Sequence, residues 1–486
     1  MPSRGGSQLA RRYHSIYQDW IRELVLRAPG LHEKERERTL FWTKQLLSAA
    51  SPSNIFWTNA AAVKRFIDSG GESLAKGIQF WMEDLNQGRF LLRMVDDEAF
   101  KVGENIATSP GSVIYRNDLM ELIQYEPTTE TTYPIPVVFI QPWINKFYIF
   151  DLTPPMSFVQ YLRDRGFTVF IVSWKNPNSL MRDVTFDDYM LQGALQAIKV
   201  ARAVCRNAQV HAAGYCIGGT ALTALMAWLN SESPERGKTF PVADWTLFST
   251  LVDYSEPGEL GFFVTRRSVE AIEEMMSEEG YLNEKYVELA FRLLGSDSLI
   301  WRNFVQSFYY GAAPPKSDIL FWNSDSTRLP EKMCSFYLRE FYLNNKLVEK
   351  DTLHLGGRPI DLSRIRQPLY AVGAQLDHIC PWRSTYKICP RVSGPVRYVL
   401  TTEGHITGIV NPPSETTRRK FWAGEAGDET DPQEWLNRQD EKRGSWWEDW
   451  TEWIRKRSLS PRKPPTMGSR RYPPIEKAPG TYVMEQ

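Results

Sequence analysis

The chain has 486 residues, enough for roughly two or three domains and a sizeable hydrophobic core. Its 58 basic and 58 acidic side chains balance, so the charge gives no reason to expect a nucleic-acid partner. Hydrophobic residues make up 42% and charged residues 24%, a balance that excludes a disordered or fibrous chain. The aromatic content, with 17 Trp, 21 Tyr and 24 Phe, is high enough to indicate an apolar site or surface as well as a core.

The first part of the chain, residues 1 to about 105, is predicted to be a helical region. Apolar residues recur there at helical spacing, as in Tyr13, Ile16, Tyr17, Trp20 and Leu24. The interpretation is a set of helices packed on a neighbouring domain, with a surface for dimerisation or docking as the alternative. The N-terminus lacks the apolar segment of a signal peptide, and no apolar run approaches the roughly 18 residues needed to span a bilayer. We therefore expect a cytoplasmic protein without a transmembrane segment.

From about residue 134, short apolar runs alternate with helical stretches. Such runs predict strands of a largely parallel sheet that is covered by helices on both faces. The six predicted strands are Pro136–Ile140, Phe167–Trp174, Gln209–Ala213, Trp245–Thr250, Pro368–Gly373 and Val396–Thr401. In such α/β sheets the chemistry lies beyond the carboxyl ends of the strands.

The predicted catalytic domain spans residues 106–455 and contains one long insertion, at about 254–366. This insertion is too long for one crossover, and it is interpreted as a helical cap over the site. Its aromatic side chains are consistent with a dry channel, although many of them could belong to a core; they are Trp301, Phe304, Phe308, Tyr309 and Tyr310. The last segment, residues 456–486, is rich in proline and basic residues and is predicted to be a solvated tail, with a polyanion contact as the alternative.

The sharpest local signal is VHAAGYCIGGT at residues 210–220. An apolar strand leads into a G-x-C-x-G turn, and a helix-forming stretch follows, which is the pattern of a nucleophile elbow with Cys216 in place of the usual serine. Glycines flank the nucleophile because the turn is strained and packs closely. The alternative is a buried, inert cysteine beside a glycine turn.

A cysteine nucleophile needs a base, and the base needs a carboxylate that orients it. In the α/β-hydrolase fold these residues follow the nucleophile in the order acid, then histidine. Asp377 follows one predicted strand and His405 follows the next, so they are the expected acid and base. His378, beside Asp377, is the rival base.

An oxyanion hole needs two backbone N–H groups that point at the substrate carbonyl. The residue after the nucleophile, Ile217, is expected to supply one of them. The loop after an early strand supplies the other, for which Ile144 is the candidate, although an ordinary turn fits that segment equally well. Cysteine in place of serine favours acyl transfer over hydrolysis, because a thioester keeps the transfer potential that an oxygen ester would lose. Pairing with histidine lowers the pKa of such a thiol.

The sequence resembles the polyhydroxyalkanoate synthase family from about residue 40 to the end of the chain. The segments that carry the resemblance include SPSN (51–54), ATSPGSVIYRNDLMELIQYEPTTE (107–130), PWINKFYIFDL (142–152), GYCIGGT (214–220), FWNSDSTRLP (321–330), SFYLREFYL (335–343), LDHICPWRS (376–384) and GHITGIVNPP (404–413). The helical region before the catalytic domain makes the chain more similar to the single-subunit type. Asn178 and Cys334 depart from the family pattern, where Asp and His are familiar.

This resemblance implies an α/β-hydrolase fold and an acyltransferase that polymerises (R)-3-hydroxyacyl-CoA, such as 3-hydroxybutyryl-CoA, into polyester and releases CoA. It also implies Cys216 as the acylated nucleophile, His405 as the general base and Asp377 as its partner. No cofactor and no metal are expected. The implied partners are the growing polyester, a second copy of the chain and possible granule-associated proteins, at the surface of cytoplasmic polyester granules.

Two alternatives remain open at this point. One is a cysteine-dependent thioesterase or hydrolase of the same fold. The other is a catalytically silent protein that coats polymer granules, although such a protein has no need of Cys216, Asp377 and His405 in this order.

Overall fold

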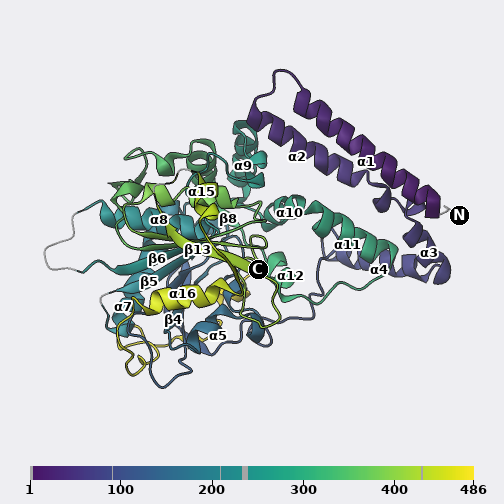
Figure 1. The fold of residues 1–486 in the computed structure, drawn as a ribbon. Coiled ribbons are helices and arrows are strands. Elements are labelled where there is room, and N and C mark those ends of the chain that lie inside the picture. Colours follow the sequence, from purple (N-terminus) through teal and green to yellow (C-terminus); the bar gives the residue numbers. More distant parts are fainter. Residues whose placement is uncertain (1–3, 90, 208, 233–238, 428, 430) are drawn as a thin grey trace. The chain divides into compact units, whose positions relative to one another are not determined.

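A computed structural model describes residues 4–89, 91–207, 209–232, 239–427, 429 and 431–486. The chain forms two compact units (Figure 1). The first consists of Met1–Ala99 and Glu288–Ser324, and the second of Phe100–Val287 and Asp325–Gln486. Among the described helices, none is long and apolar enough to cross a membrane.

The helices are α1 (Arg4–Arg27), α2 (Glu33–Ala49), α3 (Ala60–Asp68), α4 (Glu72–Asn86), α5 (Phe158–Arg163), α6 (Phe186–Asp188), α7 (Gln196–Cys205), α8 (Ile217–Asn230), α9 (Arg266–Glu279), α10 (Glu284–Leu294), α11 (Arg302–Phe304), α12 (Asp318–Ser324), α13 (Glu331–Phe336), α14 (Trp382–Tyr386), α15 (Pro432–Asn437) and α16 (Trp446–Arg455). The strands are β1 (Gly111–Arg116), β2 (Met120–Tyr125), β3 (Val137–Ile140), β4 (Val169–Trp174), β5 (Val210–Tyr215), β6 (Val242–Phe248), β7 (Tyr281–Leu282), β8 (Leu329–Pro330), β9 (His354–Leu355), β10 (Arg358–Pro359), β11 (Leu369–Ala374), β12 (Val396–Thr401), β13 (Lys420–Ala426), β14 (Glu441–Arg443) and β15 (Glu476–Lys477). Two π-helical segments, η9 (Val305–Tyr309) and η10 (Tyr337–Leu343), are also used below.

The first unit joins the N-terminal helices to a distant part of the chain. Its core forms around Ala62, Val305 and Tyr309, with Phe56, Leu74, Phe304, Phe308 and Tyr310 packed against them. Helix α4 lies directly on η9, because a Cβ atom at Gly77 would fall only 1.9 Å from the carbonyl oxygen of Phe308. The helical prediction for residues 1–105 is confirmed for most of the segment but ends too late, since the last helix there ends at Asn86.

This arrangement decides between the two interpretations of the cap aromatics. The sequence left a dry channel and a core open for Phe304, Phe308, Tyr309 and Tyr310, and they form the core that residues 288–324 share with α3 and α4. Their spacing fits both arrangements, because an apolar helical face does not identify its partner. The sequence also assigned residues 288–324 to the cap of the catalytic domain, whereas the structure groups them with the N-terminal helices.

The second unit is built on a sheet with the strand order β14-β13-β12-β11-β6-β5-β3-β4-β2-β1-β15. The six central strands from β4 to β12 are parallel, and they correspond to the six strands predicted from the sequence. The remaining strands at both edges pair antiparallel. Every residue of β3, β4, β5 and β11 is buried, as expected of a parallel sheet covered on both faces.

Helices cover the two faces of this sheet (Figure 1). Helix α8 lies on one face, and α5 and α16 lie on the other. The ring of Phe158 in α5 stacks on Trp447 in α16 with their centroids 4.1 Å apart, and it also contacts Phe248 at the end of β6. The Trp-rich segment near the C-terminus is therefore part of the core that supports the sheet.

The prediction of a solvated C-terminal tail differs from the structure. Strand β15 pairs with β1, and Tyr482 and Val483 are buried. The fully buried carboxylate of Glu121 accepts hydrogen bonds from the backbone N–H groups of Thr481 and Tyr482 at 3.1 Å. The charge and proline content of residues 456–486 concealed these contacts, because they involve a few backbone groups and two apolar side chains.

Candidate active site

Cys216 lies on a tight turn between β5 and α8. Its backbone dihedral angles, φ 51° and ψ −126°, are strained for a residue with a side chain. The turn is held close to its neighbours: a Cβ atom at Gly218 would lie 2.4 Å from the carbonyl oxygen of Ile140, and one at Gly219 would lie 2.0 Å from Oγ1 of Thr250. Only glycine fits at these two positions. The turn therefore places the thiol at the carboxyl end of a central strand, as the sequence predicted.

Asp377 lies in the turn after β11 and holds His405, which follows β12. Oδ1 of Asp377 accepts hydrogen bonds from the backbone N–H groups of Ile379 and Cys380 at 2.9 and 2.7 Å. Its other oxygen, Oδ2, lies 2.8 Å from Nδ1 of His405. Both side chains are buried. The carboxylate thus fixes the imidazole with its Nδ1 proton toward Asp377.

The order of strands and site residues is that of the α/β-hydrolase fold. A nucleophile turn follows the central strand β5, the acid follows β11, and the histidine follows the next parallel strand, β12. The fold predicted from the sequence is therefore confirmed.

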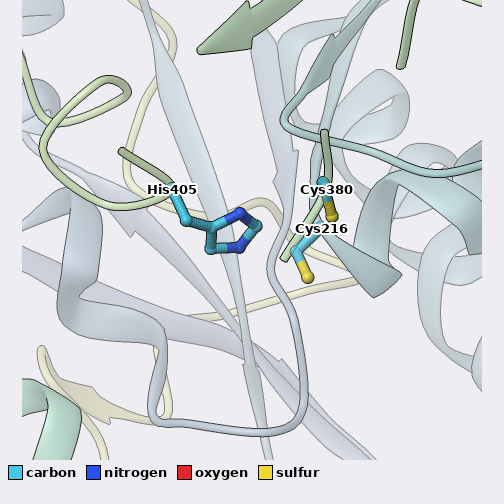
Figure 2. Close-up of side chains that lie close together, drawn as sticks. All are labelled: Cys216, Cys380 and His405. Atoms are coloured by element: carbon cyan, nitrogen blue, oxygen red, sulfur yellow. The ribbon is translucent and has the colours of Figure 1, made fainter. Parts of the chain in front are cut away.

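The structure brings Cys216 and His405 together and adds a second thiol, that of Cys380. One potential ligand atom from each of these three side chains lies within 4.8 Å of the other two. Figure 2 shows the His405 ring facing the two sulfur atoms. His378, the rival base, has an exposed side chain. Within the part of the chain that the structure describes, Cys216, Cys380 and His405 are the one group of three possible metal ligands that lie this close.

The electrostatic environment favours a thiolate at Cys216. The hydrogen bond from the Cys380 thiol, the positive charge and hydrogen bond of His405, and the backbone N–H of Ile217 together lower the pKa of Cys216, although burial opposes them. Burial alone would lower the pKa of His405, but the charges of Asp377 and of the Cys216 thiolate outweigh it and raise that pKa above its usual value. The pKa of Cys380 is raised, first by burial and then by the neighbouring thiolate. The site is therefore arranged as a thiolate–imidazolium pair beside a neutral thiol.

Two kinds of aromatic residue that sequence reasoning missed complete the site. The ring of Tyr215, next to the nucleophile, stacks on His405 at a centroid distance of 5.2 Å, and its hydroxyl donates to the His405 carbonyl oxygen. The other kind is a cluster of three rings that pack on one another, Tyr254, Tyr337 and Tyr342. The pKa of each of these three is raised, mainly by burial and also by the Cys216 thiolate. Tyr337 and Tyr342 belong to the segment SFYLREFYL and Tyr254 does not, and nothing in the sequence indicates that the three lie together.

The structure supports the two candidate oxyanion residues to different degrees. The backbone N–H of Ile217 donates toward the Cys216 sulfur, so it lies at the nucleophile. Ile144 uses its carbonyl oxygen to accept a hydrogen bond from the N–H of Thr327 at 2.9 Å. The close packing of Gly218 on the carbonyl groups of Ile140 and Gln141 brings the start of that loop to the N-terminus of α8. A role for the Ile144 N–H stays a prediction.

Comparison with known proteins identifies relatives along nearly the whole chain. Residues 7–162 match the family model described as "Poly-beta-hydroxybutyrate polymerase (PhaC) N-terminus". A poly(3-hydroxyalkanoate) polymerase from Methylorubrum extorquens is 38% identical over 98% of this chain and 78% of its own length. The poly(3-hydroxyalkanoate) polymerase subunit PhaC from Cupriavidus necator is 38% identical over 93% of this chain and 76% of its own length.

Solved structures add little to this comparison. An alpha/beta hydrolase fold protein from Chitinophaga pinensis is 11% identical and covers 63% of this chain and 94% of its own, with a TM-score of 0.35. A similarity this weak adds nothing to the strand order described above. The two polymerases identify the family, because their identity to this chain is 38% and extends over most of both sequences. The chain therefore belongs to the poly(3-hydroxyalkanoate) polymerase family.

Proposed function

We propose that this protein polymerises (R)-3-hydroxyacyl-CoA, with 3-hydroxybutyryl-CoA as the representative substrate, into polyester and releases CoA. Membership of the polymerase family supports the reaction. The observation that carries the mechanism is the thiol of Cys216 beside an imidazole that a buried carboxylate holds. Each step below uses only groups of this chain and the acyl-CoA substrate.

The first step acylates Cys216. Its thiolate attacks the thioester carbonyl carbon, and the tetrahedral oxyanion is stabilised by backbone N–H groups, with Ile217 and Ile144 as donors. The C–S bond to CoA then breaks, and the His405 imidazolium gives its proton to the departing CoA thiolate. Cys216 is left as a thioester and His405 as a neutral base.

The second step forms the ester bond. Nε2 of His405 removes the proton from a 3-hydroxyl group, and the oxygen attacks an acyl thioester carbonyl carbon. The sulfur leaves as a thiolate, and the imidazolium is restored beside Asp377, whose negative charge stabilises it. The energy for the ester bond comes from the thioester, which explains the use of cysteine.

Water must reach the acyl thioester slowly, since hydrolysis would end the chain. The tyrosines Tyr254, Tyr337 and Tyr342 pack on one another with ring centroids 4.9, 5.3 and 6.0 Å apart, and burial together with the charge of the Cys216 thiolate raises the pKa of each. They come from the second unit, and Tyr254 also bonds to Tyr337 through their hydroxyl groups at 3.3 Å. An aromatic cluster at the thiol supports polymerisation over the alternative, a thioesterase of the same fold.

The decisive experiment supplies purified protein with (R)-3-hydroxybutyryl-CoA and measures both CoA and product. We expect CoA release together with insoluble polyester that yields 3-hydroxybutyrate on hydrolysis. Soluble free acid as the sole product would identify a thioesterase, and the absence of CoA release would exclude both reactions.

The partners and location follow from the same proposal. The protein acts as a homodimer at the surface of cytoplasmic polyester granules, with granule-associated proteins as possible partners, and uses no cofactor. Support for an apolar contact comes from α1, where large hydrophobic side chains are exposed along one helix; they include Tyr13, Ile16, Tyr17, Trp20 and Leu24. Gel filtration tests the dimer, and cosedimentation with polyester granules tests the location.

A further inference from the structure

Cys380 is a second thiol in the site, and no bond forms or breaks at it in the proposed mechanism. It lies three residues after Asp377, in the same turn, and only 3% of its surface is exposed. Its sulfur, the sulfur of Cys216 and a ring nitrogen of His405 all lie within 4.8 Å of one another (Figure 2). Three side chains that are distant in sequence thus present two sulfur atoms and one nitrogen to a common point.

The histidine is oriented as metal-binding histidines usually are. Such a histidine donates one ring N–H to a carboxylate and offers the other nitrogen to the metal. Here Nδ1 is bonded to Oδ2 of Asp377 at 2.8 Å, which leaves Nε2 for the sulfur atoms. Asp377 is itself fixed by the backbone N–H groups of Ile379 and Cys380. The supporting carboxylate of a metal site is therefore already in place.

We propose that Cys216, Cys380 and His405 form a tight inhibitory site for a soft divalent cation, Zn²⁺ or Cd²⁺. Two thiolates and an imidazole are the donors that such ions prefer, and two cysteines with one histidine form a known three-residue zinc ligand set with one open position. Zinc binds thiolate sulfur at about 2.3 Å and imidazole nitrogen at about 2.0 Å. Ligand atoms within 4.8 Å of one another can meet those distances with small side-chain rotations.

Metal binding blocks the active site. The ion takes both sulfur atoms as thiolates and the imidazole in its neutral form, so binding releases protons to solvent. A bound ion occupies the lone pairs of the nucleophile and of the base. Acylation and metal binding therefore exclude each other, and a chelator restores activity. No zinc site is predicted from the sequence, because its cysteines include no CxxC pair and no histidine stands at ligand spacing. The fold brings the three side chains together.

The test is a titration of the full chain with Co²⁺, a spectroscopic substitute for Zn²⁺, in buffer with a phosphine reductant in place of thiols. We expect one equivalent to bind, with thiolate-to-cobalt charge-transfer absorption and the visible bands of a tetrahedral site, and Zn²⁺ to displace it. Cys380→Val removes one ligand and should weaken binding at least about 100-fold, since loss of a mere supporting residue already costs about 10–100-fold. Cys389→Val, which removes another buried thiol, is the matched control and should bind Co²⁺ as the unaltered protein does.

Binding requires no turnover, so this result is independent of the proposed polymerase reaction. Zn²⁺ inhibition of CoA release is measured for each variant relative to its own metal-free rate, and Cys380→Val should need at least about 100 times more Zn²⁺. Circular dichroism and the melting temperature establish folding, and Cys380→Ala replaces Cys380→Val if the latter unfolds. Equal Co²⁺ affinity with and without the Cys380 thiol would overturn the proposal, as would the absence of charge-transfer absorption in the unaltered protein.

Discussion

Replacing Asp377 by asparagine changes one atom and should nearly abolish turnover. Oδ1 of Asp377 accepts two backbone N–H groups, so the asparagine must place its carbonyl oxygen there. Its NH₂ group then occupies the position of Oδ2, 2.8 Å from Nδ1 of His405. Since an NH₂ group can only donate, Nδ1 must become an acceptor, and the proton of the neutral ring moves to Nε2. That nitrogen then carries a proton when it should remove one.

The expected loss follows from this tautomer. In serine hydrolases the same substitution lowers the rate by about 10⁴-fold, which corresponds to a barrier increase of about 5.5 kcal/mol. The negative charge that stabilises the imidazolium is also lost, so the Cys216 thiolate loses part of its support. We therefore expect a decrease in kcat of about 10³–10⁴-fold with little change in KM.

The assay is CoA release from (R)-3-hydroxybutyryl-CoA, together with the rate at which iodoacetamide alkylates Cys216 at neutral pH. Both should decrease, while the melting temperature stays within a few degrees, because the asparagine keeps both backbone hydrogen bonds. A decrease of less than about 10-fold in kcat, in a folded variant, would refute the role of Asp377.

Three further predictions can be checked with the same protein. Cys216→Ser should lower CoA release at least about 1000-fold, and normal polymer formation by this variant would show that another residue is the nucleophile. His378→Ala should keep nearly full activity because the side chain is exposed, whereas a loss as large as that of His405→Ala would reverse the assignment of the base. Burial opposes the shift at Asp253, but hydrogen bonds from Ser255 and Asn345 and the charge of Arg391 lower its pKa to about 2. Because the folded pKa lies below the unfolded value of about 3.9, the carboxylate stabilises the fold above pH 4 and loses this effect between pH 4 and 2. Asp253→Asn should therefore cost about 1–2 kcal/mol at pH 7 and little near pH 2, measured by thermal unfolding; an equal cost at both values would contradict the pKa.

The sequence predicted best the strands that are buried along their whole length. The six parallel strands appear as continuous apolar runs because both of their faces are covered. The two outermost strands were missed for the opposite reason. Strand β14 is fully exposed and β15 has two residues, so neither has an apolar pattern. Their place in the sheet comes from backbone pairing, which composition does not record.

The same distinction applies to the site. Cys216, Asp377 and His405 were predicted because each follows a recognisable strand in a known order. Cys380 was missed although it is three residues from Asp377, since a buried cysteine is usually a small apolar residue. The only clue was that Asp377 and Cys380 share a turn. The cap aromatics show a different limit, because Phe304 and Phe308 were recognised as apolar while their neighbours stayed open between a channel and a core.

The composition of the first unit sets a rule for recombining this protein with its relatives. A crossover placed at residue 99 would exchange α1–α4 but leave Val305, Phe308 and Tyr309 behind, so two sets of side chains that never evolved together would have to share one interior. Position 77 is the most sensitive, since any residue larger than glycine there would collide with the Phe308 backbone. The smallest segment that can be exchanged as a folded unit is therefore discontinuous, and residues 288–324 must be exchanged together with the N-terminal helices.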